Sequence, residues 1–309
     1  MRRVPYEQLP TERVDPRSRD LDRLSPVGIA RVMNRADREA VRAAGRAAAS
    51  IARAVGLIEA ALGAGGRLVF AGAGTSGRLG VIEAAECPPT FGTPPALVQS
   101  VMAGGRRAVF RSVEGAEDDA ADGARQIRRR ARRGDAVVGI AASGVTGFVH
   151  GALREARRRG ARTVLVTSNP GVDRRLADVV IAIATGPEVL AGSTRLKAGT
   201  ATKLVLNTLT TASFTRLGKV HGNRMVDLLP RSAKLRARAE RLVAELGGVS
   251  PGRARRLIGE ARGSSKTAIA MARLGVDARA ARRALRGAGG SLRAAIDGRP
   301  APRTHGGRR

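Results

Sequence analysis

The stretch Arg67-Leu-Val-Phe-Ala-Gly-Ala-Gly-Thr-Ser-Gly-Arg78 decides the fold of this 309-residue chain. Its apolar run, Leu68-Val-Phe70, lies between two glycine clusters and predicts a buried strand that enters a tight turn. Thr75 and Ser76 favour a helix N-terminus, and we expect that helix to end at Pro88-Pro89. Free backbone N–H groups and the positive end of the helix dipole converge at such a turn, so the stretch predicts a phosphate-bearing ligand.

Two kinds of phosphate ligand compete for this turn. Gly72-x-Gly74-x-x-Gly77 matches the dinucleotide fingerprint, which also requires an acidic residue about 20 residues further on. The next apolar strand candidate, 96–102, is followed by Ala-Gly-Gly-Arg and offers no carboxylate. The turn also lacks the Gly-Lys-Ser/Thr ending of a nucleotide-binding P-loop. The sequence therefore favours a single phosphomonoester, such as a sugar phosphate, over a nicotinamide dinucleotide.

The central part of the chain alternates apolar runs with helical segments. The predicted strands are 67–71, 96–102, 136–141, 163–166 and 179–183. Predicted helices at about 117–132 and 147–158 fill two of the gaps. Because several strands are continuously apolar, we expect a parallel sheet covered on both faces, in a doubly wound α/β domain. Ligands of such sheets bind at the carboxyl ends of the strands.

Hydroxyl-rich turns follow two more of these strands. Strand 136–141 is followed by Ala142-Ser-Gly-Val-Thr-Gly147, and strand 163–166 by Thr167-Ser-Asn-Pro-Gly171. One such turn is weak evidence, because these residues populate ordinary turns, but three at one sheet edge favour a shared site. The predicted substrate-binding residues, supplying hydroxyls and backbone N–H groups, are Gly74, Thr75, Ser76, Gly77, Ser143, Gly144 and Thr146.

Composition limits the classes of partner. The net charge of +30 would attract polyanions, but aromatic residues are only 2%, too few for stacking platforms on single strands. We therefore interpret the arginines as a solvated face and expect no specific nucleic-acid partner. No apolar run reaches the roughly 18 residues of a membrane helix, and the N-terminus lacks a signal peptide. With a single cysteine, Cys87, the chain is expected to be cytoplasmic, without a membrane partner.

Longer motifs point to a family. Gly72-Ala-Gly-Thr-Ser-Gly-Arg78 together with Ser143-Gly144 resembles the SIS (sugar isomerase) fold, which binds phosphosugars. More narrowly, the chain resembles the N-acetylmuramic acid 6-phosphate etherase family in motifs at 77–90, 113–118, 186–200 and 218–227. The resemblance begins at Thr11-Glu-Arg13 and covers nearly the whole chain.

The resemblance implies a reaction and two catalytic residues. The family cleaves the D-lactyl ether at C3 of N-acetylmuramic acid 6-phosphate, a reaction that needs two proton-transfer groups and no metal or redox cofactor. Glu86 occupies the family's proton-donor position, and Glu117 occupies the other catalytic position. Without the family, both would be interpreted as ordinary helix-end carboxylates. For either to act as an acid near neutral pH, its pKa must be raised by burial or by a neighbouring carboxylate.

Other polar residues of these motifs are weaker candidates. Glu83 lies one helical turn from Glu86 and is expected either to tune it or to pair with an arginine such as Arg78. Glu114 either orients a sugar hydroxyl or caps a turn. A role in substrate binding is a hypothesis for the polar residues of the third motif, which are Glu188, Ser193, Arg195 and Lys197. None of the three histidines has metal-ligand spacing, and we predict no metal site.

Three parts are expected along the chain. They are an N-terminal arm and helices at 1–53, the SIS domain at 54–221, and a C-terminal helical region at 222–309 with a small bundle and a disordered basic tail. The resemblance also implies a homodimer and a place in peptidoglycan recycling. The principal alternative is a sugar-phosphate-sensing regulator without enzymatic activity, because the glucokinase regulatory protein shares this ancestry. A sugar-phosphate isomerase is the remaining enzymatic alternative.

Overall fold

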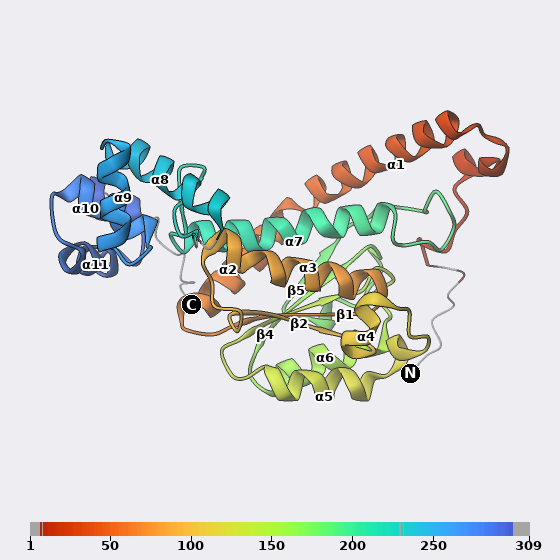
Figure 1. Ribbon diagram of the computed structural model, residues 1–309. Coiled ribbons are helices and arrows are strands. Elements are labelled where there is room, and N and C mark those ends of the chain that lie inside the picture. The colour runs from red at the N-terminus through yellow and green to blue at the C-terminus, as the bar shows by residue number, and fades with distance from the viewer. Residues whose placement is uncertain (1–6, 8, 229, 231, 299–309) are drawn as a thin grey trace. The chain divides into compact units, whose positions relative to one another are not determined.

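The computed structural model describes residues 7, 9–228, 230 and 232–298 (Figure 1). These residues form two compact units. The first unit comprises the chain up to residue 84 together with 96–210, and the second comprises 85–95 together with the chain from 211 onward. The domain boundaries predicted after residues 53 and 221 stay predictions, and the predicted disordered tail lies mostly outside the described residues.

A five-stranded parallel sheet forms the centre of the first unit. Its strands are β1 (Leu68–Gly72), β2 (Val98–Met102), β3 (Ala136–Ile140), β4 (Arg162–Thr167) and β5 (Val179–Ala182). β1 and β3 are buried along their whole length, as strands covered on both faces must be. The predicted doubly wound α/β fold, and the parallel sheet within it, are confirmed.

The strand order fixes where a ligand can bind. The order is β2-β1-β3-β4-β5, so the chain first moves from β1 to one side and then returns to β3 on the other side. Gly72 at the end of β1 is in register with Met102 of β2 and with Ile140 of β3. The loops that follow β1 and β3 therefore diverge from neighbouring strands at the same edge, which creates a crevice at the topological switch point.

Helices cover both faces of this sheet (Figure 1). One face carries α5 (Ala120–Arg130) and α6 (Gly147–Arg158), whose apolar side chains join a core with those of the sheet. The other face carries α2 (Ala48–Gly63), the first part of α3 (Gly74–Phe91) and much of α7 (Lys197–Arg216). α1 (Pro26–Arg46) precedes α2, and the short α4 (Gly105–Phe110) follows β2.

The predicted end of α3 at Pro88-Pro89 is wrong, because the helix continues to Phe91. Prolines lack the N–H that would bond the previous turn, but the backbone can stay helical when other contacts hold it. The Gly92 N–H donates to the Pro88 carbonyl over 3.0 Å. Phe91 stacks on Phe214 with ring centroids 4.8 Å apart, which anchors the last turn within the second unit.

The second unit contains the predicted helical bundle. Its helices are α8 (Ala233–Gly247), α9 (Pro251–Glu260), α10 (Ser265–Leu274), α11 (Ala278–Gly287) and α12 (Leu292–Asp297). A short hairpin of β6 (Val220–His221) and β7 (Arg224–Met225) precedes them. Each helix begins after a Ser or Asp whose side chain accepts a hydrogen bond from the first turn. All five helices of the bundle thus begin with a side-chain N-cap, and together they enclose an apolar core of their own.

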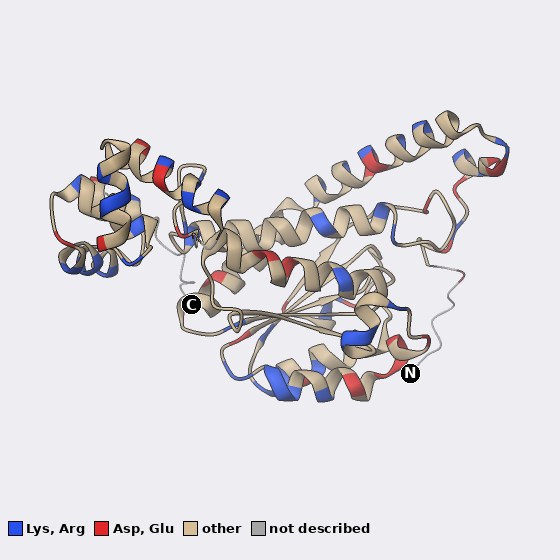
Figure 2. Cartoon of the chain, viewed as in Figure 1, with Lys and Arg blue, Asp and Glu red and all other residues tan. Residues whose placement is uncertain are grey.

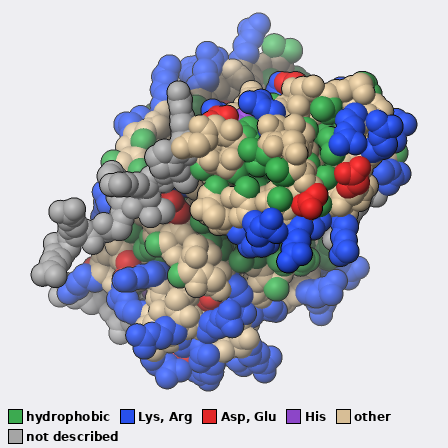
Figure 3. Space-filling model, turned by 90° about the vertical axis from the view of Figure 1, so that its left-hand side faces the viewer, with side chains coloured by type: hydrophobic (Ala, Val, Ile, Leu, Met, Phe, Trp, Pro, Cys, Tyr) green, Lys and Arg blue, Asp and Glu red, His purple; other side chains and the backbone are tan. Residues whose placement is uncertain are grey.

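Lysine and arginine are distributed over both units (Figure 2). The last turns of α5 and α6 are rich in arginine, which favours their C-termini through the helix dipole. On the face drawn in Figure 3, lysine and arginine side chains are interspersed with polar and apolar ones. Within the described part of the chain, no helix is both long and apolar enough to cross a membrane.

The buried carboxylate of Glu155 on α6 is hydrogen-bonded to two of these arginines, Arg128 of α5 and Arg158 of α6. Glu155 accepts hydrogen bonds from Arg158 Nη2 at 2.8 Å and from Arg128 Nε at 3.2 Å. The Arg158 hydrogen bond is the main reason that the pKa of Glu155 falls to about 2; burial opposes this shift, and Arg128 adds to it. The carboxylate is therefore held in its charged form in the folded protein.

We expect Glu155→Gln to destabilise the protein at neutral pH and to lose that effect in acid. A folded-state pKa below the unfolded value contributes stability that is complete above about pH 5 and lost as the pH falls toward about 2. The wild type should exceed the variant by no more than about 3 kcal/mol in free energy of unfolding, because both arginines are more than half exposed. Urea unfolding across this pH range measures the difference, and the exposed Glu260→Gln should show none. A difference that does not shrink in acid would contradict the assignment.

Candidate functional site

A pocket of about 330 Å³ lies where the loops after β1, β2 and β3 meet. It is therefore at the carboxyl edge of the sheet, beside the switch point between β1 and β3. All of its lining residues belong to the first unit. They are Leu9, Glu12, Ala73, Gly74, Thr75, Ser76, Arg78, Met102, Ala103, Ala108, Ser112, Val113, Glu114, Ala116, Glu117, Ala142, Ser143, Thr146, Gly192 and Thr194.

The start of α3 forms one wall of this pocket. The Gly77 N–H donates to the Ala73 carbonyl over 3.0 Å, so the N–H groups of Gly74, Thr75 and Ser76 belong to the first helical turn, which lacks internal acceptors. The predicted N-cap residues Thr75 and Ser76 thus lie inside the helix, and both line the pocket. This arrangement suits an anion.

Gly77 itself does not line the pocket but allows the turn to form. A Cβ at this position would lie 2.7 Å from the Gly72 carbonyl oxygen and 2.8 Å from Met102 Cγ. The first turn of α3 therefore packs directly against the end of β1. Glycine is required here by close approach rather than by a left-handed backbone.

We expect Gly77→Ala to displace the start of α3 and to weaken phosphate binding at least about tenfold. Because the new methyl group meets backbone, unfolding free energy should fall by about 1–3 kcal/mol. Titration with inorganic phosphate and urea unfolding measure the two effects. Gly56→Ala in α2 is the matched control, since a Cβ there has no neighbour within 4 Å. Unchanged phosphate affinity in the Gly77 variant would contradict this account of the turn.

The second hydroxyl-rich turn faces the first. Ser143 and Thr146 line the pocket, and Ser143 Oγ accepts a hydrogen bond from the Val145 N–H at 3.3 Å. Gly144 supports the turn from behind: its φ is +76°, and its carbonyl lies 2.8 Å from His150 Nε2. The structure thus brings together the predicted hydroxyls of both turns, while Gly77 and Gly144 shape the loops behind them.

Carboxylates occupy another side of the pocket. Glu117 lies in η4 (Ala116–Asp118), ahead of the α5 that was predicted to begin there, and its side chain is exposed. Glu114 is also exposed and accepts a hydrogen bond from Ser112 Oγ at 2.6 Å. Arg78 donates to the Ala108 and Val109 carbonyls, both at 2.9 Å, and so fixes the end of α4 beside these acids.

Glu86 belongs to the second unit, where its side chain is exposed. Glu83, one turn earlier in α3, is buried and accepts a hydrogen bond from Thr210 Oγ1 of α7. Glu83 therefore joins two helices of the first unit. Whether Glu86 and Glu117 act on one substrate stays a prediction.

Two charged residues of the pocket were missed as site candidates in the sequence. Glu12 belongs to the N-terminal arm, which we expected to be a polar extension, and Arg78 was considered only as a partner of Glu83. Glu12 reaches the pocket through long-range folding and has no local pattern that marks it, whereas Arg78 belongs to the Gly72–Arg78 motif and lies near the start of α3. The one available signal for Glu12 was the family resemblance, which already begins at Thr11.

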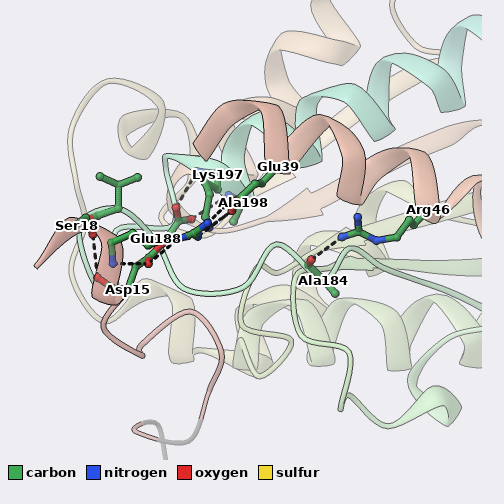
Figure 4. A network of polar contacts seen from close by, with 10 residues as sticks. Asp15, Ser18, Glu39, Arg46, Ala184, Glu188, Lys197 and Ala198 are labelled. Carbon is green, nitrogen blue, oxygen red and sulfur yellow. Dashed lines mark hydrogen bonds and ion pairs between the residues drawn. The ribbon is translucent and has the colours of Figure 1, made fainter. Parts of the chain in front are cut away.

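The third motif contributes more to structure than to the pocket. Glu188 is fully buried and accepts hydrogen bonds from the Lys197 and Ala198 N–H groups at 2.8 and 2.9 Å, capping the start of α7 (Figure 4). Burial raises the pKa of Glu188, and these two hydrogen bonds oppose that shift. Lys197, only 1% exposed, places Nζ 3.3 Å from Glu39 of α1. Neither side chain lines the pocket, and the substrate-binding role hypothesised for Glu188 and Lys197 stays a prediction.

Comparison with known families places this pocket in a SIS domain. Residues 50–157 match the model of the glucokinase regulatory protein N-terminal SIS domain, and residues 117–212 match that of the SIS domain. The two matches together cover the sheet and both hydroxyl-rich turns. The predicted SIS resemblance is therefore confirmed.

Relatives of similar length share nearly the whole sequence. A protein from Microcystis aeruginosa named N-acetylmuramic acid 6-phosphate etherase is 47% identical over 93% of this chain and 94% of its own length. Proteins of the same name from Symbiobacterium thermophilum and Rubrobacter xylanophilus are 52% and 48% identical, over 84% and 94% of this chain and 87% and 96% of their own lengths. At this identity and coverage, the similarity extends to both units.

Proposed function

We propose, because the chain belongs to the N-acetylmuramic acid 6-phosphate etherase family, that it cleaves the D-lactyl ether of N-acetylmuramic acid 6-phosphate. The products would be N-acetylglucosamine 6-phosphate and D-lactate, which makes the enzyme a carbon–oxygen lyase. The observation that carries the proposal is the pocket itself, in which a phosphate-type turn and the carboxylate Glu117 border the same space.

The phosphate of the substrate would bind at the start of α3. The N–H groups of the first helical turn point to this end, and the hydroxyls of Thr75, Ser76, Ser143 and Thr146 border it. Binding there would leave the sugar to extend toward the side that carries Glu117.

The reaction would proceed by elimination followed by addition of water. In the open-chain sugar, the C2 proton is acidic because it is next to the aldehyde. A carboxylate removes it, the C3–O bond breaks, and the ether oxygen leaves with the electron pair and takes a proton from a carboxylic acid. Water then adds at C3 and a proton returns to C2, which restores the saturated sugar. We assign the two proton transfers to Glu86 and Glu117.

The finer parts of the proposal follow from the same family resemblance. We propose that the enzyme is a cytoplasmic homodimer that serves peptidoglycan recycling. Cys87 is the single cysteine of the sequence and can form no internal disulfide, which fits a reducing compartment. Light scattering on the purified protein tests the dimer, and a monomeric mass at working concentration would contradict it.

Release of D-lactate from N-acetylmuramic acid 6-phosphate tests the activity. The wild type should release lactate and N-acetylglucosamine 6-phosphate in equal amounts. Binding of the sugar phosphate without lactate release would instead favour a sensor, the alternative that the match to the regulatory-protein domain keeps open. Conversion of one sugar phosphate into an isomer, without lactate, would favour an isomerase.

A further inference from the structure

Two hydrogen bonds attach the N-terminal arm to the loop that precedes α7. The Gly192 N–H donates to the Thr11 carbonyl over 3.0 Å, and Ser18 Oγ donates to the Val189 carbonyl over 2.8 Å. Leu9 and Thr11 are buried, with 4% and 1% of their surface exposed. An arm held at several points along its length has a fixed position, although it forms little regular structure.

This attachment places the Glu12 carboxylate at the pocket. Glu12 lines the pocket beside Gly192 and Thr194. Gly192 has φ of +77°, and a Cβ there would lie 3.0 Å from Glu12 Oε2. The glycine therefore allows the carboxylate to lie against the loop backbone. Thr11 Oγ1 lies 3.4 Å from the other oxygen, Oε1, and donates to it.

The charges of the pocket indicate what Glu12 can bind. Among its described lining residues there are three carboxylates, Glu12, Glu114 and Glu117, and one cation, Arg78. The Arg78 guanidinium donates to the Ala108 and Val109 carbonyls. A carboxylate repels both the phosphate and the lactyl carboxylate of the substrate, so Glu12 suits neither anionic end. It can accept a hydrogen bond from an uncharged donor.

We propose that Glu12 is a specificity-determining residue that accepts a hydrogen bond from an uncharged O–H or N–H donor of the sugar. This inference rests on the proposed function, because it takes the ligand to be a sugar phosphate. The proposed mechanism assigns no proton transfer to Glu12, so its contribution is to binding and orientation. It follows that the arm is part of the substrate site.

Titration calorimetry with three ligands tests the proposal. Glu12→Gln should bind N-acetylglucosamine 6-phosphate about 10- to 100-fold more weakly than the wild type, the loss typical of a hydrogen bond to a charged group. Inorganic phosphate, which lacks the sugar, should bind both proteins equally. Glucose 6-phosphate separates the donors: a loss confined to N-acetylglucosamine 6-phosphate identifies the amide N–H, and a loss for both sugars identifies a hydroxyl. Asp22→Asn, an exposed acid on the same segment, is the matched control.

Two results would overturn the proposal. Wild-type affinity of Glu12→Gln for both sugar phosphates would show that no donor reaches the carboxylate. Equal weakening for inorganic phosphate and for the sugars would show that Glu12 only supports the loop. Failure of the wild type to release lactate would refute the proposed function, whereas the sugar-dependent loss in the Glu12 variant would still be measured by binding.

Discussion

Replacing Glu117 by glutamine is expected to slow lactate release by a factor of about 10² to 10⁴, the usual contribution of a proton-transfer group. Glutamine keeps the size and hydrogen-bonding capacity of the side chain but neither gains nor loses a proton at working pH. Because the phosphate-type turn on α3 is untouched, the affinity for N-acetylglucosamine 6-phosphate should change less than about threefold. Steady-state kinetics and calorimetry on the same protein separate the two quantities.

The neighbouring Asp118 supplies the control for this variant. Asp118 shares η4 with Glu117 but does not line the pocket, so Asp118→Asn should keep wild-type turnover. If Glu117→Gln turns over within tenfold of the wild type, Glu117 does not transfer a proton in the slow step. A large loss in both variants would point to disruption of the short helix.

Replacing Glu86 by glutamine should reduce turnover by a similar factor of at least about 10². The carboxylate is exposed on α3 in the second unit, so glutamine should leave the free energy of unfolding within about 0.5 kcal/mol. Lactate release and thermal unfolding of the variant test these two expectations together. Loss of activity without loss of stability is the pattern expected of a residue that acts in chemistry.

Glu260→Gln provides a matched exposed change in the same unit and should retain full activity. Full activity of Glu86→Gln would remove it from the reaction and leave Glu117 to be paired with another acid, Glu114 being the nearest in sequence that lines the pocket. A combined Glu86 and Glu117 variant should be little worse than either single one, because the two groups serve one reaction.

The sheet and the phosphate turns could be predicted because their signals are local. Short apolar runs with glycines before and after them left little choice of structure for β1 and β3. The hydroxyl-rich turns then followed from strand direction, since parallel strands deliver their carboxyl ends to one edge. The helical region of the second unit was predicted, but the Ser or Asp that caps each of its helices was not used to place them.

Features that depend on distant contacts were not predictable. Pro88-Pro89 was expected to end α3, but stacking of Phe91 on Phe214 holds one more turn. A substrate role was one hypothesis for Glu188 and Lys197, but their burial could not be predicted: Glu188 caps α7 and Lys197 lies beside Glu39 (Figure 4). A buried polar residue and a catalytic one have the same appearance in sequence, and only burial and partners distinguish them.

The position of Glu12 in the pocket was likewise not predictable from local sequence. Its segment has no helical or strand periodicity, and its position depends on one hydrogen bond from Gly192 and on the burial of Leu9 and Thr11. Such contacts join residues about 180 positions apart, which no local pattern encodes. The structure therefore adds Glu12 to the pocket, a residue for which the family resemblance was the only signal in the sequence.

The fate of solvent oxygen tests the central claim most directly. The purified enzyme is incubated with N-acetylmuramic acid 6-phosphate in water enriched in ¹⁸O, and both products are analysed by mass spectrometry. Elimination at C2–C3 followed by addition of water predicts one ¹⁸O at C3 of N-acetylglucosamine 6-phosphate and none in the lactate hydroxyl. In deuterated water the same sugar should carry deuterium at C2. Label in the lactate, with C2 unexchanged, would mean that the lactyl carbon–oxygen bond breaks and would contradict the account.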